Sequence, residues 1–377
     1  MRCHMSKALK SGSLVALAFG AMTTMSVAAD RVVNVYNWSD YIDPAILEDF
    51  TKETGIKVKY DVFDSNDLLE TKLLAGKTGY DVVVPSANFL GRQISAGVFV
   101  KLDKSKLPNL KHVWPDVAAR LSAFDPGNQY AVNYMWGTTG IGYNVNKIKE
   151  RMPDAPLDSW RMVFDPAVIS KFKDCGVMFL DAPDEVIPAA LNYLGKDPNS
   201  RTPEDFAAAE ELLKKVRPFV KKFHSSEYIN ALANGDACLV IGWSGDIKQA
   251  ASRAEEKSKT QKDPKKKVEV GYIIPKEGAG TFYDNLTIPK DAKNIDEAYA
   301  FIDYLLRPEV IAKASNAISY ANGNIDSQAF IDKAILEDRS VFPDESTMKK
   351  LFTVLPITDQ KVQREATRIW RDIKRKQ

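Results

Sequence analysis

The sequence is poor in the side chains on which many enzymes and metal sites depend. Its 377 residues include three histidines and three cysteines. No His/Cys cluster has the spacing of metal ligands, and no glycine-rich loop follows a predicted strand to hold a phosphate. The motif Gly242-Trp243-Ser244-Gly245 falls short of a nucleophile elbow, because its second glycine comes one position early. We therefore expect no catalytic residue, no metal and no cofactor.

Long apolar runs are also scarce, and the one near the N-terminus is short. A basic start precedes the apolar segment 14–22, and Ser26-Val27-Ala28-Ala29 carries the small residues that a signal peptidase recognises. We expect residues 1–29 to be a cleaved signal peptide, with an uncleaved membrane anchor as the alternative. No cysteine stands directly after the apolar run, so a lipid anchor is not expected. No later run of about 18 apolar residues occurs, which predicts a soluble mature chain.

Neither sign of charge dominates the sequence. Lysine and arginine number 52 against 50 aspartates and glutamates. Nucleic-acid binding usually needs a basic face, so we expect no nucleic-acid partner. The lysine-rich stretch 255–267 is better explained as a solvated helix end and loop.

Two cysteines, Cys175 and Cys238, remain once the segment that contains Cys3 is removed. An even number of cysteines in an exported protein favours a disulfide. On the chain-entropy model this crosslink would stabilise the fold by roughly 4 kcal/mol. Two buried free thiols are the alternative.

Strand and helix patterns alternate along the chain. Strands are predicted at 32–36, 57–63, 81–84, 177–180, 237–241, 271–274 and 286–288. Helices are predicted at 44–54, 68–74, 90–97, 202–215, 295–305 and 359–375. This alternation predicts an open α/β sheet. The length exceeds what one hydrophobic core usually serves, so we expect two lobes.

Acidic, aromatic and hydroxyl side chains recur near the ends of the predicted strands, where open α/β sheets bind their ligands. They lie in segments 37–41, 85–87, 181–185, 242–246 and 282–285. Carboxylates bind ammonium groups, and aromatic faces attract cations by about 0.5–2 kcal/mol each. The pattern therefore favours an organic cation whose methylene chain packs against Trp38, Trp243 and Phe282.

Each of these residues also has a structural explanation. A tryptophan at a strand end is often a core residue, and Asp43 and Asp184 can be helix caps. An amino acid or dipeptide ligand would need an arginine for its carboxylate, and the strand-end segments contain none. An exported hydrolase with paired carboxylates, such as Asp184 and Glu185, is the alternative from another class. His112 and His224 are expected at the surface.

Several motifs resemble the putrescine/spermidine-binding proteins of bacterial ABC importers. Val33-Asn34-Val35-Tyr36-Asn37-Trp38-Ser39-Asp40-Tyr41-Ile42 is similar to their opening strand, and Tyr80-Asp81-Val82-Val83-Val84-Pro85-Ser86 to their third strand. Segment 136–144 resembles their crossover segment. Trp243-Ser244-Gly245-Asp246 and Phe282-Tyr283-Asp284-Asn285 match their tryptophan–aspartate and aromatic–aspartate pairs. The resemblance covers the chain after residue 30 and implies a type II-like periplasmic binding protein fold, with the ligand in the cleft between two lobes.

The resemblance also implies a role for individual residues. The aromatic box would consist of Trp38, Tyr41, Trp243, Phe282 and Tyr320. Ser39 and Ser86 would add polar contacts. The ammonium groups would bind Glu185, Asp246 and Asp284, with Asp40 nearby. Relatives that prefer spermidine tend to carry threonine in place of Ser39 or tryptophan in place of Phe282, which favours putrescine here. Spermidine, cadaverine and agmatine are the alternative ligands.

Lobe boundaries and partners complete the prediction. Residues 30–136 would form the first part of lobe 1 and 137–249 the first part of lobe 2. Residues 250–306 would return to lobe 1, and 307–377 would be C-terminal helices that lie mainly on lobe 2. Chain crossings are expected near Gly137 and in 244–251. The resemblance implies a non-catalytic, monomeric periplasmic protein that delivers a polyamine to the permease subunits of an ABC importer.

Overall fold

A computed structural model describes residues 31–263 and 266–375. Within these residues the strands form one 11-stranded sheet in the order β2-β1-β3-β9-β4-β7-β5-β6, with β8 and β10 paired to β4 and β11 paired to β9. The strands are β1 (Val32–Trp38), β2 (Lys57–Phe63), β3 (Val82–Val83), β4 (Ala131–Asn144), β5 (Val177–Phe179), β6 (Lys222–Phe223), β7 (Leu239–Trp243), β8 (Val270–Ile273), β9 (Gly280–Thr287), β10 (Ala321–Asn322) and β11 (Phe352–Thr353).

Helices connect these strands, and their ends carry the capping residues that the sequence predicts. The Asp43 carboxylate accepts a hydrogen bond from the backbone N–H of Ala45 at the start of α1, and Gly55 ends that helix with a φ of 71°. The α-helices are α1 (Pro44–Thr54), α2 (Asn66–Ala75), α3 (Ala87–Ser95), α4 (Pro115–Leu121), α5 (Val145–Arg151), α6 (Arg161–Phe164), α7 (Pro166–Ile169), α8 (Pro183–Tyr193), α9 (Pro203–Val216), α10 (Glu227–Asn234), α11 (Ser244–Thr260), α12 (Ile295–Leu305), α13 (Pro308–Ile318), α14 (Lys333–Leu336), α15 (Glu345–Met348) and α16 (Gln360–Lys374).

Strand β4 links two sets of parallel strands. Strands β2, β1 and β3 are parallel neighbours, as are β6, β5 and β7. Strand β4 has 14 residues: 131–139 pair with β9, 139–143 pair with β7, and 141–144 pair with β8. The sequence pattern did not reveal this strand as a whole, because its glycines weaken a strand signal. Gly140 is needed there, since a Cβ would lie 2.3 Å from the carbonyl oxygen of Ile273.

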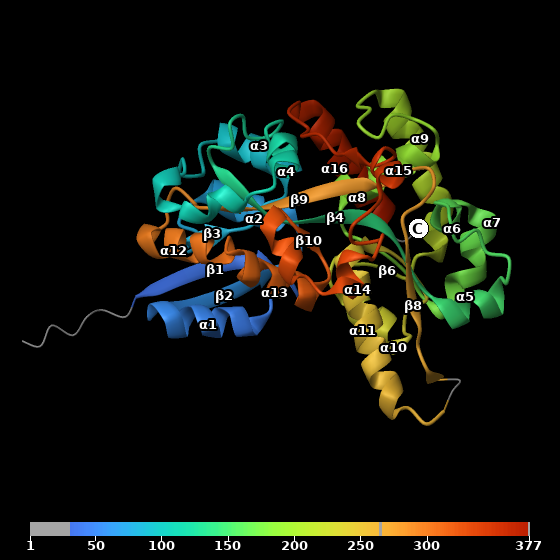
Figure 1. The fold of residues 1–377 in the computed structure, drawn as a ribbon. Helices are drawn as coiled ribbons and strands as arrows, with labels where there is room; N and C mark the ends of the chain where they lie inside the picture. The colour runs from blue at the N-terminus through green and yellow to red at the C-terminus, as the bar shows by residue number, and fades with distance from the viewer. Residues whose placement is uncertain (1–30, 264–265, 376–377) are drawn as a thin grey trace, which may run out of the picture. The chain divides into compact units, whose positions relative to one another are not determined.

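Two hydrophobic cores flank this central strand. The first draws its buried side chains from 33–136 and 283–341, and the second from 141–279 and 366–373. Segments far apart in the sequence therefore share a core: α12 contacts β1, and α13 contacts α1, as the orange and blue elements of Figure 1 show. The predicted α/β alternation is confirmed. The predicted lobe boundaries stay a prediction.

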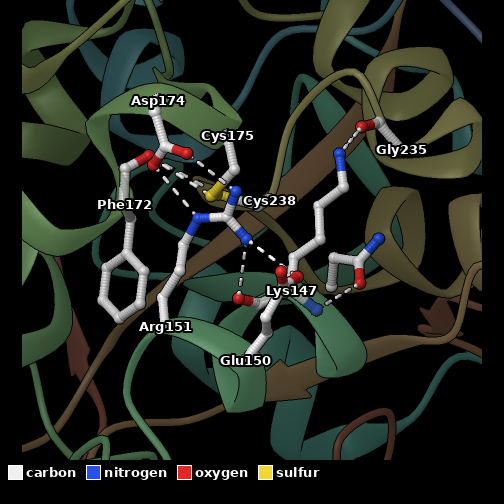
Figure 2. A network of polar contacts seen from close by, with 9 residues as sticks. Lys147, Glu150, Arg151, Phe172, Asp174, Cys175, Gly235 and Cys238 are labelled. Carbon is white, nitrogen blue, oxygen red and sulfur yellow. Dashed lines mark hydrogen bonds and ion pairs between the residues drawn. A yellow bond between two sulfur atoms is a disulfide. The ribbon is translucent and has the colours of Figure 1, made fainter.

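The predicted disulfide between Cys175 and Cys238 is present and lies in the second core. Cys175 ends the 3₁₀ segment η3 (Ser170–Cys175), and Cys238 immediately precedes β7. Figure 2 shows this disulfide and, beside it, the ion pair between Arg151 and Asp174. Arg151 Nη2 lies 2.8 Å from Asp174 Oδ2. The disulfide thus links the segment before β5 to the start of β7.

Two kinds of structure are absent from residues 31–263 and 266–375. No helix there is both long and apolar enough to cross a membrane. No group of three or more His, Cys, Asp or Glu side chains there is arranged to hold a metal ion. The predicted signal peptide lies outside the described residues.

Candidate ligand-binding site

A pocket forms where side chains from both core-forming parts of the chain meet. Ten of the eleven predicted ligand-binding residues line it: Trp38, Ser39, Tyr41, Ser86, Glu185, Trp243, Asp246, Phe282, Asp284 and Tyr320. The other lining residues are Phe63, Asp64, Ser65, Asn66, Asp67, Asp181, Ala182, Asp184 and Ser225. Neither His112 nor His224 is part of this lining.

Asp284 is held by two hydroxyl groups. The Tyr41 hydroxyl donates to Asp284 Oδ2 at 2.7 Å, and Ser86 Oγ donates to Asp284 Oδ1 at 2.5 Å. Asn66, at the start of α2, in turn donates to Ser86 Oγ at 3.1 Å. Burial raises the pKa of Asp284 to about 6, although both hydrogen bonds act to lower it.

Asp246 is held in a similar way in the first turn of α11. Its Oδ1 accepts a hydrogen bond from the Tyr320 hydroxyl at 2.7 Å, and its Oδ2 accepts one from the Tyr228 hydroxyl at 2.7 Å. Burial raises the pKa of Asp246 to about 7, against the lowering effect of the two tyrosines. Asp246 is only 4% exposed, so it is shielded from bulk water.

Glu185 is a third carboxyl group of the pocket and is half-buried. It lies in the first turn of α8, where the positive end of the helix dipole favours an acidic side chain. Thr139 Oγ1 of β4 donates to Glu185 Oε2 at 2.6 Å. Burial, reinforced by the charge of neighbouring Asp184, raises the pKa of Glu185. Asp184 itself accepts a hydrogen bond from Asn88 Nδ2 of α3 at 2.8 Å.

The pocket lacks a cation of its own. No lysine, arginine or histidine is among its described lining residues, whereas the carboxyl groups of Glu185, Asp246 and Asp284 all line it. An ion buried without a partner is costly, which is why the pKa values of these carboxyl groups rise. A ligand with more than one positive charge would supply the missing partners.

Aromatic rings form a continuous wall around these acids. The ring centroids of Trp38 and Trp243 lie 5.5 Å apart, and those of Trp243 and Phe282 lie 6.2 Å apart. Phe282 continues to Tyr320 at 6.0 Å, and Tyr320 to Tyr41 at 4.9 Å. The five rings provide flat apolar faces for a methylene chain and electron-rich faces for a cation.

Asp40 is the predicted site residue that does not line the pocket. Its carboxylate pairs with Arg253 of α11 at 2.6 Å, and its carbonyl oxygen accepts a hydrogen bond from Gln249 Nε2 at 3.1 Å. The residue has a φ of 56°, which turns it out of the strand direction of β1. Its side chain therefore has a charged partner within the protein.

Sequence reasoning missed the lining segment from Phe63 to Asp67. Phe63 ends β2, and the segment continues into the start of α2. The strand was predicted with the correct bounds, so the rule that ligand residues come after strand ends could have found this segment too. Phe282 and Asp284 also differ from expectation, because they lie within β9 rather than beyond a strand end.

Comparison with known proteins assigns the family. Residues 45–342 match the family model described as bacterial extracellular solute-binding protein. The chain belongs to this family. This solute-binding protein is 54% identical over 365 residues to the putrescine-binding periplasmic protein SpuD of Pseudomonas aeruginosa, covering 96% of this chain and 97% of that one. It is 50% identical over 368 residues to the putrescine-binding periplasmic protein PotF of Escherichia coli, covering 97% and 96%.

A solved structure extends the comparison to the fold. A putative spermidine/putrescine ABC transporter from Listeria monocytogenes aligns with a TM-score of 0.79 and 32% identity, covering 91% of this chain and 99% of that one. The predicted two-lobed α/β fold and the resemblance seen in the sequence motifs are thereby confirmed. The prediction that the solute-binding protein is not an enzyme is confirmed as well, since SpuD and PotF are named as binding proteins.

Proposed function

We propose that this protein captures putrescine in the periplasm and delivers it to the permease subunits of an ABC importer. The names of its relatives support this, because SpuD and PotF are putrescine-binding periplasmic proteins. The polyamine is expected to bind in the pocket between β1, β7 and β9.

The proposal rests on one observation: the carboxylates of the pocket have no basic side chain beside them in its lining, and aromatic rings line the same pocket. Asp246 and Asp284 are each held by two neutral hydroxyl groups, which orient the carboxylates without neutralising them. Each can accept an ammonium group in a charge-assisted hydrogen bond. The methylene chain between two ammoniums would pack against Trp38, Trp243 and Phe282. Glu185 would add charge along the same pocket.

Titration calorimetry tests this function and ranks the alternative ligands. Putrescine, cadaverine, spermidine and agmatine are titrated into protein freed of bound amines by unfolding and refolding. We expect putrescine to bind most tightly and to be recovered chemically unchanged. Failure of all four amines to bind would overturn the proposal, and conversion of an added amine or a glycoside would favour the carboxylate-dependent hydrolase.

Export and lobe architecture belong to the same proposal. We infer cleavage after Ala29, so N-terminal sequencing of periplasmic protein should begin at Asp30. The division of the buried residues between the two hydrophobic cores supports a first lobe boundary near Gly137. The same division favours a second boundary at about 280, where β9 begins, instead of 250. It likewise favours lobe 1 for 310–341 and lobe 2 for 366–373. A monomer with no affinity for nucleic acid is expected in solution.

A further inference from the structure

A buried tyrosine outside the pocket touches two of the proposed binding residues with one oxygen atom. Tyr228 lies on α10, is 0% exposed and is not among the residues that line the pocket. Its hydroxyl donates to Asp246 Oδ2 at 2.7 Å and accepts a hydrogen bond from the backbone N–H of Trp243 at 3.1 Å. The hydroxyl thus bridges the end of β7 and the first turn of α11.

The surrounding glycines show that the tyrosine ring has a fixed place. A Cβ at Gly242 would lie 2.6 Å from Tyr228 Cε2, so the ring lies directly against the β7 backbone. Gly245 lies in the first turn of α11, and a Cβ there would be 2.3 Å from Tyr320 Cδ2. The two glycines of the Gly242-Trp243-Ser244-Gly245 motif therefore admit one tyrosine each, and both tyrosines donate to the same carboxylate.

We propose that Tyr228 is a positioning residue for amine capture, whose hydroxyl holds the Asp246 carboxylate and the Trp243 backbone in the arrangement that meets an ammonium group. The inference rests on the proposed function. Tyr320 makes the equivalent contact from inside the pocket and can touch the ligand itself. Tyr228 acts on the ligand solely through Asp246 and Trp243.

The charged and titratable groups around this pair set the expected pH behaviour. Two helices contribute groups that face Asp246: Tyr228 comes from α10 and Arg253 from α11. Tyr320, which precedes β10, also faces it, as do Asp40 and Tyr41 from the loop after β1. Tyr272 of β8 also faces Tyr228. The hydrogen bond from Tyr228 lowers the pKa of Asp246, which burial raises to about 7. Removing this donor leaves the carboxyl group protonated up to a higher pH.

Tyr228→Phe tests the proposal because it keeps the ring and removes the hydroxyl. A hydrogen bond to a charged group is lost, so putrescine affinity at pH 7 should fall about tenfold. The pH below which putrescine binding weakens should also move upward, and affinity should recover in part at pH 9. A purely structural role would instead lower the thermal midpoint and leave the pH profile of binding unchanged.

Tyr299→Phe is the matched control. The Tyr299 hydroxyl is also buried in a hydrogen bond, from the Asp103 backbone N–H at 2.7 Å, but Tyr299 is not part of the pocket lining. This variant should lose stability without any change in putrescine affinity or pH profile. An equal loss of affinity in Tyr299→Phe and Tyr228→Phe would overturn the positioning role.

A double-mutant cycle with Asp246→Asn shows whether Tyr228 acts through the carboxylate. Removing the Tyr228 hydroxyl should cost little further affinity once Asp246 is an amide, whereas an additive loss contradicts the proposal. If Tyr228→Phe does not fold, 3-fluorotyrosine at position 228 serves instead. Its stronger donor should move the acid limit of binding to lower pH, and an unmoved limit counts against the proposal. If wild-type protein binds no putrescine, the proposed function fails and this inference fails with it.

Discussion

The hydroxyl of Tyr41 donates a 2.7 Å hydrogen bond to the carboxylate of Asp284, although 243 positions separate the two residues in the chain. Tyr41 follows β1, and Asp284 lies in β9. The two strands are not neighbours, because β3 lies between them in the sheet. The contact therefore spans β3, and it holds the carboxylate at one acidic end of the pocket.

Asp284→Asn should weaken putrescine binding by more than tenfold. The substitution keeps the size of the side chain but removes its charge, and loss of one partner of a buried charge pair typically costs about 2–5 kcal/mol. Asp246→Asn should have an effect of similar size. Calorimetric titration at pH 8 measures both, and unchanged affinity in both variants would remove these aspartates from the binding site.

Asp81→Asn provides a buried comparison for these two variants. Asp81 is 1% exposed and accepts hydrogen bonds from Asn34 and Asn294, but it does not line the pocket. This change should reduce the thermal midpoint and leave putrescine affinity within about twofold of wild type, as expected for independent sites. A tenfold loss here would mean that affinity follows stability rather than direct contact.

Putrescine binding should strengthen as the pH rises from about 5 to 8. Burial raises the pKa of Asp284 to about 6 and that of Asp246 to about 7, because it disfavours their charged forms. A bound diammonium favours the charged forms and lowers both values, so protons leave on binding. Affinity should rise by about tenfold per pH unit for each carboxyl group that must ionise.

Proton release can be counted directly. Calorimetry at pH 6 in two buffers with different ionisation enthalpies should give a positive number of protons released per putrescine bound. Asp246→Asn should reduce that number. The same observed enthalpy in both buffers, together with a flat pH profile, would contradict the raised pKa values of these carboxyl groups.

The cysteine pair should matter for stability and not for affinity. Thiol counting on denatured, unreduced periplasmic protein should find no free thiol, and two free thiols would contradict the bond. Replacing Cys175 and Cys238 with serine should lower the free energy of unfolding by about 2–5 kcal/mol. Putrescine affinity should stay within about twofold, because neither cysteine lines the pocket.

Much of the site could be predicted because parallel strands carry their ligand residues to one edge of the sheet. Ser86 comes soon after β3, as its sequence pattern indicates, and Trp38 is the last residue of β1, although the predicted strand stopped at Tyr36. Trp243 ends β7 and precedes the first turn of α11, which contains Asp246. Local pattern is sufficient there, since each residue's place follows from its own strand.

The remaining features depend on contacts that no local pattern encodes. Asp40 looks like a ligand residue in its motif, but Arg253 of a distant helix pairs with it. Tyr228 resembles an ordinary core residue of α10, and its role depends on where β7 and α11 meet. The glycines of β4, such as Gly140, weaken its strand signal in the sequence. A side chain at Gly140 is excluded by the backbone of the neighbouring strand β8, which the local sequence does not reveal.

A ligand that bridges the two halves of the pocket should change the shape of the protein in solution. We expect Trp38, Ser86 and Asp284 to lie on one side of the predicted cleft, and Glu185 and Asp246 on the other. A ligand shifts a closure equilibrium through contacts that it makes better in the closed state. Putrescine should therefore reduce the radius of gyration in X-ray scattering, whereas butylamine, which engages one carboxylate, should not. Equal compaction by both amines would contradict bridging.

The size of the side chain at position 282 should set the preference for chain length. Phe282 lies over the β4 backbone so closely that a Cβ at Gly137 would be 2.8 Å from its Cζ. An indole cannot extend in that direction, so in Phe282→Trp it must extend into the pocket or displace Trp243 or Tyr320, whose rings lie 6.2 and 6.0 Å away. Either change alters the space for a methylene chain, so the ratio of putrescine to spermidine affinity should shift by several-fold. Phe282→Leu, which removes bulk, should shift the ratio by a different amount than Phe282→Trp. Calorimetric titration of both amines measures the ratio, and an unaltered ratio in both variants would show that Phe282 does not determine selectivity.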